Sequence, residues 1–187
     1  MRRGTRTALV IGLVVLGLFF LLVAPYNSLV SLEEQVRQAR ADVEVALQRR
    51  LELIPNLVET VKGYAAHERT TLKEVVEARA KVATAPTLEQ KLAANDALTR
   101  ALSRLMVVVE RYPELKASAN FRALQDQLEG TENRIAVART RYNRAVRAYN
   151  TAIRRFPTII IARLLGFKPY EPFKASPEAA RAPKVKF

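Results

Sequence analysis

Apolar residues recur along most of the chain at the three- and four-residue spacing that is typical of amphipathic helices. The pattern is clearest over residues 121–156, where it lasts for five heptads and predicts a long helix packed as in a coiled coil. Large and small side chains alternate along this seam, which would let a neighbouring helix approach closely. The predicted seam consists of Phe121, Leu124, Leu128, Thr131, Ile135, Ala138, Tyr142, Ala145, Tyr149, Ala152 and Phe156.

Prolines divide the rest of the chain, because a proline inside a helix removes a hydrogen bond and clashes with the preceding turn. No stretch alternates with a period of two, so strands are not expected. We predict an all-α protein in which a transmembrane helix precedes an up-and-down antiparallel bundle over 27–167, with four helices favoured. A long kinked hairpin stays open as an alternative, because the apolar stripe runs through Pro55. Thr87 and Ser118 are predicted helix N-caps. The dividing prolines are Pro25, Pro55, Pro86, Pro113 and Pro157.

An uninterrupted run of 17 residues near the N-terminus has no polar side chain. As a helix it would be about 26 Å long, close to the thickness of a bilayer core. It lacks the cleavage residues of a signal peptide. We therefore predict a transmembrane anchor over 8–26 after a basic tail at 1–7, with Arg2, Arg3 and Arg6 favouring a cytoplasmic tail and a bundle outside. The predicted anchor residues are Ala8, Leu9, Val10, Ile11, Leu13, Val14, Val15, Leu16, Leu18, Phe19, Phe20, Leu21, Leu22, Val23 and Ala24.

The C-terminal part of the chain has two sections of different character. Residues 168–187 are basic and rich in proline, which predicts a disordered tail. Residues 156–167 are apolar but too few to span a bilayer. They could cap the open end of the bundle, or rest on a membrane interface with Arg163 and Lys168 among the lipid headgroups.

Composition excludes several kinds of chemistry. The chain has no cysteine and one histidine, His67, so a disulfide scaffold, a cysteine nucleophile and an iron–sulfur cluster are excluded. A zinc motif would need a second histidine at position 71, which is Thr71. We predict no catalytic residue, no cofactor-binding residue and no metal ligand, and a protein that is not an enzyme.

The chain carries 31 basic and 18 acidic residues, for a net charge of +13. Basic residues beside the seam form a strip without an acidic residue between Glu132 and Glu171. The strip is either a solvated face or a binding surface for anionic lipid or polymer. Nucleic acid is not a predicted partner, because no helix-turn-helix or aromatic-interleaved pattern is present. The candidate anion-binding residues are Arg134, Arg141, Arg144 and Arg147.

A second candidate surface surrounds the proline at position 55. Arg49, Arg50, Pro55 and Asn56 would form either a docking kink for a partner or a structural kink with Arg–Glu pairs along the helix. The dipeptide Tyr-Asn occurs three times and predicts hydrogen bonds between the first and last helices. These structural candidates are Tyr26, Asn27, Tyr142, Asn143, Tyr149 and Asn150.

Long stretches of the chain resemble the LemA family. They are YN-x-LV from Tyr26, the run QRRLELIPNLVETVKGYAAHE over 48–68, the run from ERYPELK to RAVRAYN over 110–150, and the final Gly166-Phe167. The resemblance implies a membrane-anchored helical bundle of bacterial type and no particular reaction. It also implies an N-terminus outside the cell, opposite to the orientation that the arginines favour.

Together these observations predict a non-enzymatic binding or scaffolding protein of the bacterial cytoplasmic membrane. The expected partner is an envelope membrane protein of unknown identity. Binding of anionic lipid or envelope polymer through the arginine strip and basic tail is the alternative function. Lateral packing into a homo-oligomer is compatible with the long seam and the anchor.

Overall fold

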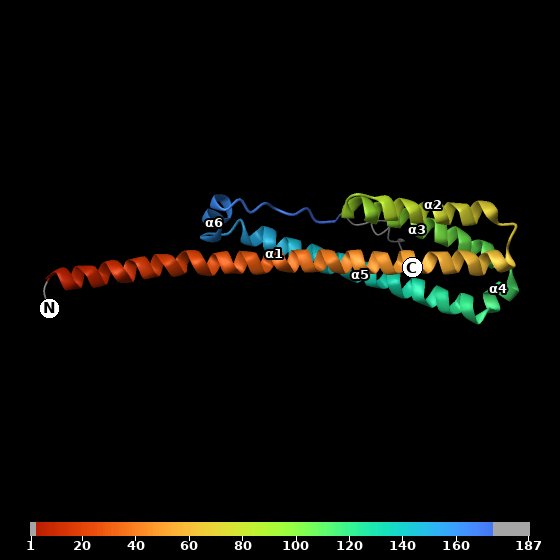
Figure 1. Ribbon diagram of the computed structural model, residues 1–187, viewed down its shortest axis with the longest axis horizontal. Coiled ribbons are helices and arrows are strands. Elements are labelled where there is room, and N and C mark those ends of the chain that lie inside the picture. Colours follow the sequence, from red (N-terminus) through yellow and green to blue (C-terminus); the bar gives the residue numbers. More distant parts are fainter. Residues whose placement is uncertain (1–2, 174–187) are drawn as a thin grey trace, which may run out of the picture. The chain divides into compact units, whose positions relative to one another are not determined.

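The computed structural model describes residues 3–173, apart from the side chains of 3–8, 14–15 and 17–22. Every regular element within the described residues is a helix, which confirms the all-α class (Figure 1). Most of the predicted C-terminal tail lies outside the described residues. The helices are α1 (Arg3–Tyr64), α2 (Arg69–Thr84), α3 (Leu88–Val109), α4 (Pro113–Ala117), α5 (Ala119–Ala152) and α6 (Thr158–Leu164).

The chain forms two compact units. Unit 1 combines Met1–Arg40 with Arg141–Pro172, and unit 2 combines Ala41–Thr140 with Phe173–Phe187. Helices α1 and α5 therefore contribute a part to each unit, whereas α2, α3 and α4 belong to unit 2 and α6 belongs to unit 1.

The core of unit 2 is a continuous apolar cluster. Helices α2 and α3 are joined by a short connection and lie side by side as an antiparallel hairpin (Figure 1). Buried side chains from α1, α2, α3 and α5 meet in the cluster, and Leu115 of the short α4 closes it beside Phe121. Burial of this apolar surface is the main stabilising term of the unit.

Both predicted N-caps are confirmed. The Thr87 hydroxyl accepts a hydrogen bond from the Gln90 N–H at 3.2 Å, and the Gln90 side chain accepts one from the Thr87 N–H at 3.3 Å. This reciprocal capping box satisfies two donors at the start of α3. The Ser118 hydroxyl accepts a longer bond, 3.5 Å, from the N–H of Phe121 in the first turn of α5.

The helix boundaries expected at Pro25 and Pro55 are wrong, because α1 continues without a break through both prolines. Proline lacks the N–H that would bond the carbonyl four residues earlier, which for Pro55 belongs to Leu51. In unit 2 the Nε of Arg79, on α2, donates a hydrogen bond to that carbonyl at 2.9 Å. Because the vacated acceptor has a new donor and the apolar stripe is uninterrupted, the chain stays helical. The long-helix alternative holds at this position.

The seam predicted along α5 holds in its first part and then shifts. Positions from Phe121 to Tyr142 are largely buried as expected, but Val146 and Ile153 are buried where Ala145 and Ala152 were predicted. A straight α-helix has 3.6 residues per turn, so its buried face drifts by about 20° per heptad away from a strict seven-residue repeat. Over several heptads this drift moves the buried face by one residue.

Among the residues that the structure describes, no helix carries a stretch both long and apolar enough to cross a membrane. Several side chains of the predicted anchor lie outside the described residues. Those described at the N-terminal end of α1 are between 52% and 60% exposed: Leu9, Val10, Ile11, Leu13 and Leu16.

Candidate functional site

In unit 1 hydrogen bonds from side chains of α5 to the backbone of the segment after α6 fix this segment to α5. The Asn150 side chain both donates to the Tyr170 carbonyl at 2.7 Å and accepts from the Tyr170 N–H at 3.0 Å. The Tyr142 hydroxyl donates to the Glu171 carbonyl at 3.3 Å. Side-chain amides can replace a backbone partner in this way because they carry a donor and an acceptor on one plane. The segment therefore has a defined path without being helical.

Aromatic rings hold the same segment. Tyr170 packs edge-on against Tyr149 with ring centroids 5.3 Å apart, and its hydroxyl donates to the Glu33 carboxylate at 3.1 Å. Tyr149 is almost fully buried, and burial, with a smaller contribution from Glu33, raises the pKa of its hydroxyl to about 12. Tyr26 packs edge-on against Phe167 at 6.3 Å.

The Tyr-Asn residues were predicted to form hydrogen bonds between the first and last helices. Tyr142, Tyr149 and Asn150, on α5, contact the segment around Tyr170, and the Tyr170 hydroxyl in turn donates to Glu33 on α1. This segment therefore links α5 to α1 within unit 1. Asn27 is exposed and Asn143 is half-buried.

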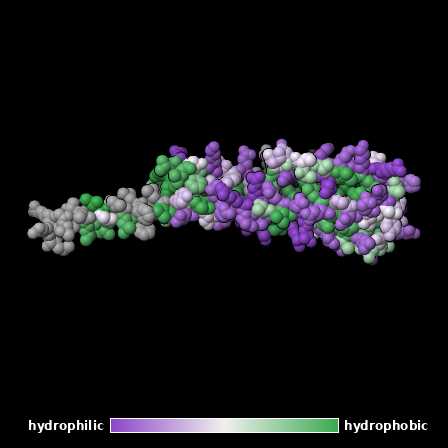
Figure 2. Space-filling model, in the orientation of Figure 1, coloured by the Kyte–Doolittle hydropathy of each residue, from purple (hydrophilic) through white to green (hydrophobic). Residues whose placement is uncertain are grey.

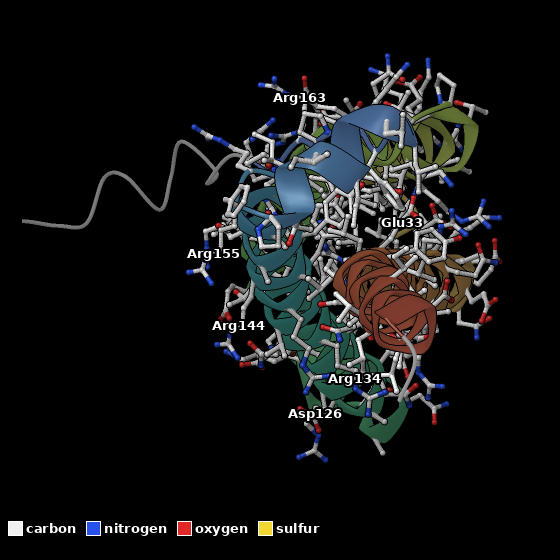
Figure 3. The ribbon with its side chains drawn as sticks, turned by 90° about the vertical axis from the view of Figure 1, so that its left-hand side faces the viewer. Glu33, Asp126, Arg134, Arg144, Arg155 and Arg163 are labelled. Carbon is white, nitrogen blue, oxygen red and sulfur yellow. The ribbon has the colours of Figure 1, made fainter. Side chains whose placement is uncertain are left out.

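A cleft of about 380 Å³ lies on α5 in unit 1, and three arginines line it. All three lie within the basic strip that the sequence predicted, and Arg147 is one of the strip's candidate anion-binding residues. Arg141 and Arg144 of the predicted strip are exposed beside it, and Arg134 is exposed in unit 2. Figure 3 shows Arg144 and Arg155 pointing away from α5 into solvent. The cleft is lined by Val146, Arg147, Asn150, Thr151, Arg154, Arg155 and Pro172.

The arginines at positions 49 and 50 have opposite environments. Arg49 is exposed, but the Arg50 side chain is buried in unit 2 and forms an ion pair with Glu132 of α5. Its Nη1 also donates to Asn95 Oδ1 at 2.7 Å and to Thr99 Oγ1 at 3.1 Å. Burial lowers the pKa of the Arg50 guanidinium, and the carboxylate of Glu132 opposes this shift.

Arg50 therefore pairs with another helix. The pairing expected within the helix joins an arginine and a glutamate three residues apart, which are Arg49 and Glu52. The Glu52 carboxylate accepts a hydrogen bond from Gln48 at 3.0 Å instead. Pro55 and Asn56 are exposed. Within the described residues, a partner could therefore reach Arg49, Pro55 and Asn56 of the predicted kink, but not Arg50.

A second cleft, of about 320 Å³, lies where α1 ends in unit 2. Beside it, the Glu68 carboxylate accepts hydrogen bonds from Arg111 at 2.8 Å and from the Tyr112 hydroxyl at 3.0 Å. The bond to Glu68 raises the pKa of Tyr112. The neighbouring His67 is exposed. The lining residues are Tyr64, Arg111, Tyr112, Pro113, Glu114 and Leu115.

The clefts offer charge, hydrogen bonds and apolar contact. Within the described residues, no group of three or more His, Cys, Asp or Glu is placed to hold a metal ion.

The fold and these surfaces define a class of protein: an α-helical bundle with polar residues buried between its helices. The chain belongs to the LemA family, whose sequence profile matches residues 39–187.

Several known proteins are similar to this chain. Magnetosome protein MamQ of Magnetospirillum gryphiswaldense is 30% identical over 81% of this chain, and the chain spans 65% of that protein's length. Magnetosome protein MamQ 2 of Paramagnetospirillum magneticum has the same identity and coverage. Protein LemA of Metamycoplasma hominis is 25% identical over 86% of this chain and 74% of its own length. The chain thus spans just under two thirds of the magnetosome relatives it matches.

Proposed function

We propose that this protein is anchored in the bacterial cytoplasmic membrane through residues 8–26 and acts without catalysis as a binding or scaffolding factor of the cell envelope. The bundle lies on the extracytoplasmic side, because the arginines are concentrated before the anchor. The observation that carries the proposal is that α1 joins the apolar run and the bundle in one unbroken helix.

The apolar start of α1 supports anchoring on physical grounds. Leu9, Val10, Ile11, Leu13 and Leu16 are all more than half exposed. Contiguous apolar surface of this kind is unfavourable in water and marks a contact with lipid or protein. A lipid environment would cover every side of the helix at once.

Anchoring predicts resistance to extraction. We expect the wild-type protein to stay in the membrane fraction after alkaline carbonate treatment. Replacing Leu13 and Leu16 by arginine should release it, because an arginine near the centre of a spanning helix costs about 2.5–3.5 kcal/mol. Val107→Arg is the matched control, since Val107 is 72% exposed on α3. Extraction of the wild-type protein by carbonate would exclude the anchor.

Scaffolding predicts a reproducible neighbour on the outer side of the membrane. The chain has no cysteine, so Val107→Cys provides a single exposed thiol. A membrane-impermeant maleimide carrying a photoreactive group should label it in intact cells and crosslink it to the same envelope protein in repeated experiments. Labelling only after lysis would reverse the proposed orientation. Labelling without a recurrent adduct would contradict the scaffolding role.

The arginine-lined cleft supports the alternative function, binding of anionic lipid or envelope polymer. Arg147, Arg154 and Arg155 bring three positive charges to one concave surface, and Asn150 and Thr151 add hydrogen-bonding groups. Phosphate oxygens would be held there by charge-assisted hydrogen bonds.

A further inference from the structure

Helix α6 has one buried face and one exposed apolar face. Ile161 and Ala162 are buried in unit 1, as capping of the bundle end requires. Leu164 and the preceding Phe156 are 80% and 82% exposed, and Ile160 between them is 56% exposed. Ile160 and Leu164 are four residues apart on α6 and therefore lie on one side of the helix, whereas Phe156 precedes the first residue of α6. The sequence left two alternatives for this segment, capping of the bundle and contact with a membrane. Capping explains the buried face of α6 but not its exposed apolar face.

Other large apolar side chains of unit 1 are exposed as well. Leu165, Tyr26 and Val30 are between 42% and 55% exposed. Figure 2 shows apolar surface gathered over α6. A patch of large apolar side chains beside charged residues marks a surface that is covered in the working state of a protein.

Basic residues flank α6 along the chain. Arg163 lies on α6, Lys168 follows it, and Arg154 and Arg155 precede it and line the cleft on α5. None of these four residues forms an ion pair within the described part of the chain. The sequence places no acidic residue between Glu132 and Glu171. Apolar side chains interleaved with unpaired cations are typical of segments that lie in the interface of an anionic membrane.

The position of α6 within unit 1 favours a membrane as the partner. Phe167, just after α6, contacts the ring of Tyr26, which lies two residues beyond the apolar run that ends at Ala24. If the apolar run is in the bilayer, the exposed face of α6 is at the level of the lipid headgroups.

We propose that α6 docks on the surface of an anionic lipid bilayer. Phe156, Ile160 and Leu164 enter the interface, Arg163 contacts headgroups, and the cleft on α5 receives a headgroup phosphate. This inference rests on the proposed anchoring and adds a second, peripheral membrane contact. An anchor at residues 8–26 would hold the protein in the membrane without α6, so the docking of α6 is a separate prediction.

The test uses the full chain, reconstituted in vesicles of phosphatidylglycerol and phosphatidylcholine. Leu164→Cys carries an environment-sensitive fluorophore, and Val107→Cys, on α3, carries the same label as the matched control. We expect a blue-shifted emission at position 164 that is quenched by lipids bearing a nitroxide near the headgroup. The label at position 107 should remain water-exposed and unquenched.

The cationic contribution is tested by replacing Arg154, Arg155 and Arg163 together by alanine. We expect quenching at position 164 to fall by roughly half or more, because each surface cation contributes to the attraction by an anionic membrane. Arg69, Lys81 and Arg122 are exposed in unit 2, and their joint replacement by alanine is the charge-matched control. This control should leave the quenching unchanged.

The outcomes separate the two proposals. A label at position 164 that stays in water while the chain resists carbonate extraction overturns the docking of α6 and leaves the anchor intact. Failure of the chain to remain with the vesicles overturns the anchor. A blue shift without nitroxide quenching shows that a second copy covers α6, and equal quenching in purely phosphatidylcholine vesicles overturns recognition of anionic lipid.

Discussion

Replacing Glu132 by alanine should destabilise the protein by roughly 2–3 kcal/mol. The Arg50 side chain is 4% exposed, and Glu132 is its ion-pair partner. Removing one member of a buried pair leaves an uncompensated charge, which typically costs about 3–5 kcal/mol. We expect less, because the Glu132 side chain is 42% exposed and Asn95 and Thr99 still accept from the guanidinium. The measurement is the free energy of unfolding of the detergent-solubilised chain, followed by helical circular dichroism.

Two variants distinguish the ion pair from a general effect of charge on α5. Glu129→Ala removes an exposed carboxylate from the same helix and should change the stability little. The double replacement Arg50→Met with Glu132→Leu removes both charges and should recover much of the loss, since apolar residues of similar size often substitute for buried pairs. A Glu132→Ala variant as stable as the wild type would show that the pair contributes nothing.

The partner of Arg50 illustrates what a single sequence can and cannot predict. The sequence marked Arg50 as a candidate residue of a docking kink, and the only ion pairs it suggested there were Arg–Glu pairs within one helix. Hydrophobic periodicity assigns residues to a face, but it does not fix which residue of another helix lies opposite. Glu132 lies 82 positions later in the chain, and its contact depends on the register between α1 and α5.

The C-terminal segment shows a different limit. Its prolines correctly indicate that residues 168–173 are not helical. They gave no sign that the segment is ordered, because its order comes from Asn150, Tyr142 and Tyr149. The recurrent Tyr-Asn pairs were the available signal, and they were interpreted as contacts between helices. Side-chain bonds to a distant backbone have no sequence period and so cannot be predicted from spacing.

The helical elements themselves were largely predictable. Good helix formers, the cap at Thr87 and the apolar stripe correctly indicated α-helices between the prolines. The helix boundary was expected at Pro55 because a proline usually interrupts a helix. A donor from another helix can replace the hydrogen bond that proline removes, and this possibility was not considered. The stripe running through the proline was the evidence for a continuous helix, and the compensating donor, Arg79, could only be found in three dimensions.

That compensation leads to a second large effect. Replacing Pro55 by alanine should stabilise the folded protein, raising its free energy of unfolding by about 1–2 kcal/mol. In a regular helix a proline costs more, about 3 kcal/mol. The gain is smaller because Arg79 already satisfies the Leu51 carbonyl. Replacing Arg79 by methionine in the wild-type background should cost about 1–3 kcal/mol, since it leaves a buried acceptor without a partner.

The two changes should be coupled. In the Pro55→Ala background the restored N–H at position 55 can bond the Leu51 carbonyl, so the loss caused by Arg79→Met should shrink by about 1 kcal/mol. Chemical denaturation of the four chains measures this coupling directly. Arg69→Met, an exposed change at the start of α2, is the matched control and should not depend on residue 55. Additive effects of the Pro55 and Arg79 changes would mean that the Arg79 bond does not support the helix at the proline, and the continuity of α1 would then rest on apolar packing alone.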